Sequence, residues 1–223
     1  MITLVLAEAE LERIPTELLH HPAVIAHARQ RGKTPERILL DSNYHHAAMQ
    51  TLPEGRRRGR PDMTHLFLLT ALESIANKQG HLKVLIHTRN NEMITVDPET
   101  RIMRNYERFL GLMEQLFETQ SVPDKKHPLL TLTTNTTLPH LIEALHPDVV
   151  LVFSKTGKPV ILQEYFKKTR GKNIVCIIGG FPSGEFHTDL TPLTTDTVSL
   201  FSEMLPVWTV TREILVNYEN ASR

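Results

Sequence analysis

The stretch IVCIIGGFPSGEF, Ile174 to Phe186, decides the fold and lies near the end of the chain. It opens with the apolar run Ile174 to Ile178, and a short run of this kind closed by glycine is typical of a buried strand. Gly179, Gly180 and Gly184 follow, and glycine lets a backbone turn sharply and lets a ligand approach it. We therefore expect a buried strand that ends either in a loop lining a small-molecule site or in an ordinary turn. Because no Lys-Ser or Lys-Thr pair follows Gly184, a P-loop is excluded.

The residues around this stretch alternate between strand and helix patterns. Apolar runs predict strands at 129–133, 149–153 and 174–178, and helical patterns lie between them at 138–145 and 159–169. Such alternation indicates a mainly parallel sheet with helices packed on its faces. Ligands of parallel sheets collect at the carboxyl ends of the strands. We expect three loops to converge there: Thr133–Asn135, Ser154–Gly157 and Gly179–Gly184.

The first half of the chain adds further elements. Ile2–Ala7 is predicted as a buried strand, and Ile38–Leu40 as a short strand followed by Asp41, which we interpret as a helix cap. A helix is expected to begin at Pro61 and Asp62 and to end at Gly80, with an apolar stripe formed by Leu66, Leu69, Leu72, Ile75 and Ala76. Segments 82–87 and 94–96 form a predicted hairpin, and 205–218 a final helix.

Arginines gather in two places. Arg56, Arg57, Arg58 and Arg60 lie in EGRRRGRPD, where they either contact phosphate or form a solvated charge run. Arg101, Arg104 and Arg108 are spaced so that a helix would present them on one face. These three either form a second basic patch or pair with Glu99, Glu107 and Glu114.

Composition excludes several classes of protein. Lys plus Arg equals Asp plus Glu, at 25 each, so net charge does not indicate the partner. The single cysteine, Cys176, allows no internal disulfide and favours a reducing compartment. We find no membrane-spanning segment and no signal peptide, which predicts a cytoplasmic protein. The twelve histidines lack metal-ligand spacing, and no G-x-S-x-G nucleophile motif occurs, so we expect no metal.

Taken in order, four segments resemble one family: RRRGRPDMTH, DPETRIMRNYERFLGLMEQL, FSKTGKP and IGGFPSGEF. Together they are similar to the small-subunit rRNA pseudouridine N1-methyltransferases, which belong to the SPOUT class. The resemblance covers nearly the whole chain, and the short N-terminus resembles the archaeal members. It implies an α/β fold with a mainly parallel sheet, helices on both faces and a C-terminal trefoil knot. Residues 1–223 would form one domain, with an RNA-contacting β-hairpin and helix insertion at about 40–120 and a knotted donor-binding part at 128–223.

The resemblance also implies an activity. S-adenosylmethionine would be the methyl donor, a homodimer the working unit, and N1 of a pseudouridine in a hairpin loop of small-subunit rRNA the acceptor, in small-subunit ribosome biogenesis. The arginines that match the family's RNA contacts are Arg60, Arg101, Arg104 and Arg108. The residues that match its donor site are Gly179, Gly184, Ser199, Leu200, Phe201, Ser202, Glu203 and Met204, of which Glu203 departs from the neutral residue expected.

Asp62 matches the family's acid beside the first of these arginines. By motif it is the nearest candidate for a catalytic base, but we interpret it as the group that orients Arg60. Two other functions remain open from the sequence. One is a non-catalytic RNA-binding factor of ribosome assembly, and the other is a knotted methyltransferase for a different RNA base.

Overall fold

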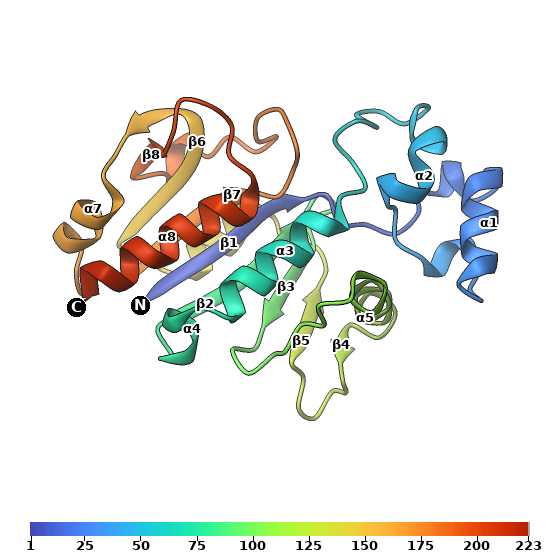
Figure 1. Cartoon of the computed structure of the whole chain (residues 1–223), viewed down its shortest axis with the longest axis horizontal. Helices are drawn as coiled ribbons and strands as arrows, with labels where there is room; N and C mark the ends of the chain where they lie inside the picture. Colours follow the sequence, from blue (N-terminus) through green and yellow to red (C-terminus); the bar gives the residue numbers. More distant parts are fainter. Residues whose placement is uncertain (223) are drawn as a thin grey trace.

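The computed structural model describes residues 1–222 and contains one eight-stranded sheet in the order β4-β5-β3-β2-β1-β7-β6-β8 (Figure 1). The strands are β1 (Ile2–Ala9), β2 (Leu82–Thr88), β3 (Met93–Val96), β4 (Ser121–Val122), β5 (Leu130–Thr133), β6 (Val149–Pro159), β7 (Ile174–Gly179) and β8 (Asp196–Ser199). The helices are α1 (Pro22–Gln30), α2 (Ser42–Met49), α3 (Pro61–Leu72), α4 (Ile75–Lys78), α5 (Tyr106–Thr119), α6 (Leu138–Ala144), α7 (Leu162–Lys168) and α8 (Val207–Ser222), with short 3-10 turns at Thr16–Leu18, Pro35–Arg37 and Thr191–Leu193.

The sheet is parallel from β2 to β8, which confirms the mainly parallel α/β fold. β1 pairs in parallel with β2 and with β7, and β6 pairs in parallel with β7 and with β8. The β2–β3 hairpin is antiparallel, as the alternating pattern predicted. The prediction that 129–133 adjoins the later parallel strands was wrong, because β5 pairs antiparallel with β3 and β4. A short apolar run indicates burial but carries no information about its partner.

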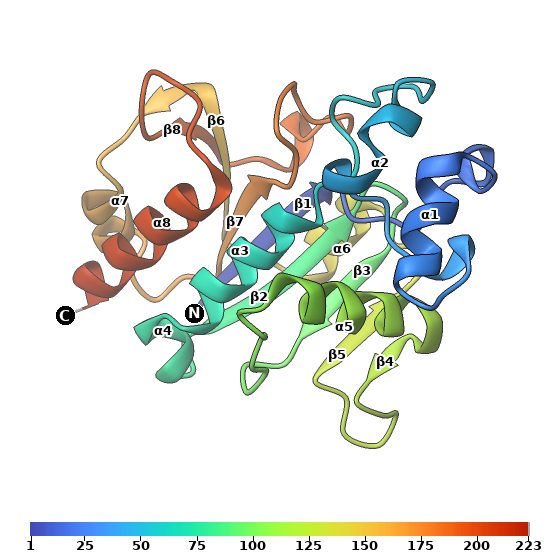
Figure 2. The ribbon, with the colours of Figure 1, turned by 45° about the vertical axis from the view of Figure 1, so that its right-hand side comes forward.

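Both faces of the sheet are covered, and the alternation of β1 explains why. Ile2, Leu4 and Leu6 belong to a core shared with α3, α5, α7 and α8. Val5 and Ala7 point to the other face and belong to a smaller core that includes α6. Figure 2 shows α3, α5 and α8 in front of the sheet and α6 behind it. A strand buried on both faces loses its polar alternation, which is why β1 and β7 appear as continuous apolar runs.

The helix predicted from Pro61 to Gly80 is two helices. α3 ends at Leu72, and α4 begins after Ser74, whose side chain accepts a hydrogen bond from the Asn77 amide. The predicted apolar stripe was partly wrong. Leu72 and Ala76 are buried as predicted, whereas Leu66 is 36% exposed and Ile75 46% exposed. Leu66 precedes the break, and the buried face of α3 is turned away from it, toward Met63, Phe67, Leu68 and Ala71.

Residues 11–60 form a lobe beside the sheet that contains α1 and α2 (Figure 1). It has its own small core around Leu18, Val24 and Leu40. The strand predicted at 38–40 is reduced to a single bridge between Arg13 and Leu39. Asp41 caps α2 as predicted, since its Oδ1 accepts a hydrogen bond from the Asn43 amide at 2.8 Å.

Among residues 1–222, no helix is both long enough and apolar enough to cross a membrane.

Candidate functional site

The carboxyl ends of β6, β7 and β8 surround a cavity of about 390 Å³. Its walls come from the loops after these strands, from the first turn of α3 and from the start of α8. Ligand cavities of parallel α/β folds lie at this edge of the sheet. Seven of the eight predicted donor-site residues line it, and Ser202 lies in the same loop without lining it: Gly179, Gly184, Ser199, Leu200, Phe201, Glu203 and Met204.

Only one of the three loops expected to converge does so, the glycine loop after β7. The predicted loop Ser154–Gly157 lies within β6, where the pairing with β8 is irregular between Phe153 and Lys158, and its Ser154 and Lys155 line the cavity. The Thr133–Asn135 loop does not line the cavity, because β3, β2 and β1 separate β5 from β7. The loop after β8 takes its place, since β8 pairs with β6 at the edge of the sheet.

The glycine loop packs closely against the end of β1. A Cβ on Gly180 would lie 2.5 Å from the Ala9 Cα, so no larger residue fits there without a shift of the backbone. The Gly180 amide donates to the Ala7 carbonyl at 2.8 Å, which fixes this approach. Gly184 has φ of +92°, a conformation that side-chain-bearing residues rarely adopt. Gly179 and Gly184 line the cavity, and Phe181 and Pro182 line it between them.

Arg60 lines this cavity and is held by Asp62. Arg60 Nε donates to Asp62 Oδ1 at 2.8 Å and Nη2 donates to Oδ2 at 2.7 Å. The bond to Asp62 raises the pKa of Arg60. The Arg60 amide also donates to the Glu10 carbonyl at 2.8 Å, which ties the start of α3 to the end of β1. Both oxygens of Asp62 are used, an arrangement suited to orienting the guanidinium.

Arg101, Arg104 and Arg108 are all exposed, but they do not share one helical face. α5 begins at Tyr106, with Asn105 as its cap, so only Arg108 is helical and the predicted single face was wrong. The Asn105 side chain accepts from the Arg108 amide, and this cap sets the helix start later than the arginine spacing indicated. Glu107 and Glu114 pair with Arg31, and Glu114 also pairs with Lys33.

Two hydrogen bonds tie this arginine segment to α3 and to the lobe. His65, on α3 one turn after the Arg60–Asp62 pair, bonds through Nε2 with the Met103 carbonyl at 2.7 Å. Tyr106 donates to Asp41 Oδ2 at 2.6 Å, and burial raises the pKa of Asp41. The segment from 101 to 108 therefore lies along the helix whose first turn lines the cavity.

Comparison with known proteins assigns the family. The model of the EMG1/NEP1 methyltransferase family matches residues 4–219. This protein belongs to that family. It is 50% identical over 220 residues to the ribosomal RNA small subunit methyltransferase Nep1 of Methanothrix thermoacetophila, covering 99% of this chain and 96% of the relative. It is 47% identical to the Thermococcus kodakarensis protein of the same name, covering 99% of both chains.

A solved structure of the family has the same fold. The crystal structure of Archaeoglobus fulgidus Nep1 bound to S-adenosylhomocysteine is 38% identical to this chain, with a TM-score of 0.87. The alignment covers 99% of this chain and 98% of that one. Within residues 1–222, we find no group of three or more His, Cys, Asp or Glu side chains that could hold a metal ion.

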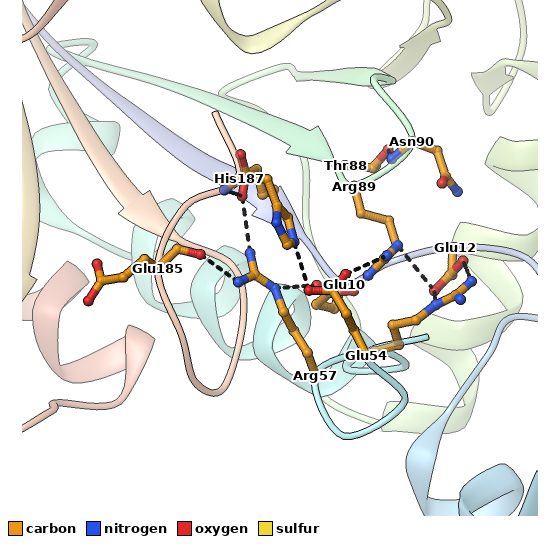
Figure 3. A network of polar contacts seen from close by, with 11 residues as sticks. Glu10, Glu12, Glu54, Arg57, Thr88, Arg89, Asn90, Glu185 and His187 are labelled. Atoms are coloured by element: carbon orange, nitrogen blue, oxygen red, sulfur yellow. Dashed lines mark hydrogen bonds and ion pairs between the residues drawn. The ribbon is translucent and has the colours of Figure 1, made fainter. Parts of the chain in front are cut away.

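Two members of the first arginine cluster serve neither role expected of them. Arg57 and Arg58 are largely buried, with side chains 8% and 11% exposed, in a network with carboxylates at and beyond the end of β1 (Figure 3). These carboxylates are Glu8, Glu10 and Glu12. These three glutamates were not predicted to have a role, although they occupy alternate positions in AEAELE and so bring like charges to the end of one strand. Buried carboxylates of this kind require positively charged or hydrogen-bonding partners.

Proposed function

We propose that this protein transfers a methyl group from S-adenosylmethionine to N1 of a pseudouridine in a hairpin loop of small-subunit rRNA, as a step of ribosome biogenesis. The observation that supports it most is the juxtaposition of the cavity with arginines on α3 and beside α5. Relatives across the full length are named for methylation of small-subunit rRNA. The choice of pseudouridine follows from the family resemblance of the motifs.

The cavity suits the methyl donor. Its volume of about 390 Å³ is in the range of small-molecule sites. Its lining combines apolar residues such as Phe181 and Leu200 with Gly179 and Gly184, whose backbone can offer amides and carbonyls to a nucleoside. We assign donor binding to Gly179, Gly184 and the loop Ser199–Met204, by analogy with the relative that binds S-adenosylhomocysteine. When bound, the donor supplies a methyl group already activated by its sulfonium. The protein then has only to hold the two reactants in line and to exclude water.

The arginines are proposed to hold the RNA. Arg60, Arg101, Arg104 and Arg108 would contact phosphates, since guanidinium forks match phosphate oxygens. Arg60 lines the cavity, so a phosphate held by it would bring the adjoining base close to the donor. The target base has to leave any stack to enter the cavity. Asp62 orients Arg60, and its two engaged oxygens favour this role over that of a proton acceptor.

Four further properties belong to the same proposal: a homodimer, a trefoil knot, an RNA-contacting insertion and a cytoplasmic location. We infer a homodimer, because exposed apolar side chains on the neighbouring helices α3 and α8 include Leu66, Trp208 and Val216, and apolar surface of this kind is typical of an interface. Sedimentation equilibrium would give twice the mass of one chain. We also infer the trefoil knot within residues 128–223, and the RNA-contacting insertion at about 40–120. A cytoplasmic location suits the buried, unpaired Cys176.

Calorimetry with S-adenosylhomocysteine tests the catalytic proposal against the simplest alternative. A methyltransferase is expected to bind the product with a one-to-one stoichiometry per chain. A protein that binds RNA hairpins but shows no heat with millimolar S-adenosylhomocysteine would be a non-catalytic assembly factor instead.

A further inference from the structure

The wall of the cavity depends on side chains that come from outside it. The loop from Phe181 to Asp189 contains no helix or strand in the described structure. Its backbone is held instead by side chains, beginning with one carboxylate: the amides of His187 and Thr188 donate to Glu8 at 2.8 Å each. Glu8 is 3% exposed and has φ of +50° at a bulge in β1. A non-glycine residue keeps such a conformation only where its surroundings fix it.

Arg57 is the group that joins this loop to the strand. Its Nη2 donates to Glu8 at 3.0 Å, its Nε donates to Glu10 at 2.8 Å, and its Nη1 donates to the Glu185 carbonyl at 2.6 Å (Figure 3). The guanidinium also lies over the Phe181 ring, with its central carbon 3.7 Å from the ring centroid. Phe181, Gly184 and Glu185 all line the cavity.

We propose that Arg57 is a positioning residue for the methyl donor: with Glu8, it holds the cavity wall from Phe181 to Thr188 in the conformation that binds S-adenosylmethionine. The inference rests on the proposed donor site. Arg57 itself does not line the cavity, so its effect passes through Phe181, Glu185 and the Glu8-bound amides. A planar fork is needed here, because one side chain reaches two carboxylates and a carbonyl at once.

The chain contains a matched control for this proposal. Arg58, the next residue, makes a fork of its own with Glu12, with Nε and Nη2 donating at 2.8 and 2.7 Å. The two pairs are similarly buried, with Arg58 11% and Glu12 3% exposed against 8% for Arg57 and 4% for Glu8. Neither Arg58 nor Glu12 lines the cavity. Breaking either pair should therefore affect folding alike, but only the Arg57 pair touches the glycine loop.

The test compares Arg57→Lys with Arg58→Lys, both of which keep the charge and lose the fork. Trp208 is the only tryptophan and lines the cavity, so its fluorescence can follow titration with S-adenosylhomocysteine. We expect Arg57→Lys to raise the Kd by about tenfold, the effect of losing charge-assisted bonds, and Arg58→Lys to change it less than about twofold. The KM for S-adenosylmethionine should rise in parallel, while kcat at saturating donor stays within about threefold. Hydrogen exchange at 181–188 should quicken in Arg57→Lys only.

A second pair keeps the test decisive if Arg57→Lys does not fold. Glu8→Gln and Glu12→Gln change only charge and one acceptor, and the first should weaken binding of S-adenosylhomocysteine while the second should not. If both variants of a pair fold and give the same Kd for S-adenosylhomocysteine, the role of Arg57 is overturned. This holds for the two arginine variants and for the two glutamate variants, whether the shared Kd is raised or equals that of the wild type. A wild-type protein that binds S-adenosylhomocysteine but methylates no RNA would overturn the proposed reaction and leave this comparison intact.

Discussion

Arg60 and Asp62 are joined by two parallel hydrogen bonds across the first turn of α3, Nε to Oδ1 and Nη2 to Oδ2. An asparagine side chain has a single oxygen facing the guanidinium and could accept only one of them, so Arg60 would lose its fixed orientation in the cavity lining. We expect Asp62→Asn to lower the rate of RNA methylation by about tenfold, with the Kd for S-adenosylhomocysteine unchanged within about twofold. Glu99→Gln, which removes the same charge from an exposed site, is the control. Equal losses in both variants would contradict the orienting role.

Arg104 and Arg108 should contribute to RNA binding through charge alone. If each meets one phosphate, its replacement by alanine reduces the slope of log K against log salt by about 0.7–0.9 unit. Fluorescence anisotropy of a labelled hairpin between low and high salt measures this slope. Lys168→Ala is the control, because this exposed residue ends α7, at the opposite side of the molecule from α5 (Figure 1). A slope unchanged in the arginine variants would place the RNA elsewhere.

Gly180 should tolerate no side chain. The added Cβ of Gly180→Ala would lie 2.5 Å from the Ala9 Cα, which forces β1 and the glycine loop apart. We expect a loss of about 1–3 kcal/mol in the free energy of unfolding, together with weaker binding of S-adenosylhomocysteine. Gly111→Ala is the counterpart, because its Cβ would meet nothing closer than 3.9 Å inside α5 and should stabilise the protein by about 1 kcal/mol. Urea unfolding of the two variants measures both effects.

The lobe should lose stability in mild acid through His45. This side chain is fully buried, its Nδ1 accepts from the Asp41 amide at 3.0 Å, and its Nε2 lies 3.0 Å from His27 Nδ1. Burial lowers the pKa of His45 to about 4. Between pH 6.5 and 4 the unfolded chain therefore binds a proton that the folded chain does not, so stability is complete above pH 6.5 and falls as the pH drops.

The measurement is the free energy of unfolding from pH 7.5 to 4.5. The contribution of His45 has a limiting slope of about 1.4 kcal/mol per pH unit. His45→Gln should remove this contribution, and His140→Gln, at an exposed position, should retain it. Parallel pH profiles for the wild type and His45→Gln would show that His45 does not carry the effect.

The parts of the fold that local pattern could predict are those set by burial and glycine. The apolar run at Ile174, the glycine loop after it and the Pro61 helix start each depend on a few neighbouring residues. The role of Arg57 depends on Glu10, 47 residues earlier, and on the Glu185 carbonyl, 128 residues later. No local pattern distinguishes such a buried arginine from Arg60, three positions on, which reaches the cavity. The antiparallel pairing of β5 with β3 was not predicted for the same reason, because the sequence of a four-residue strand does not indicate which distant strand it pairs with.

If this protein methylates N1 of a pseudouridine, an ordinary uridine cannot replace the acceptor. In uridine N1 is bonded to the ribose, whereas in pseudouridine N1 carries a hydrogen that the methyl group replaces, with release of a proton. The direct measurement is transfer of labelled methyl from S-adenosylmethionine to two otherwise identical hairpins, one with pseudouridine and one with uridine in the loop. We expect labelled methyl in the pseudouridine hairpin alone. Equal labelling of the two hairpins would show that the protein does not methylate N1 of pseudouridine specifically.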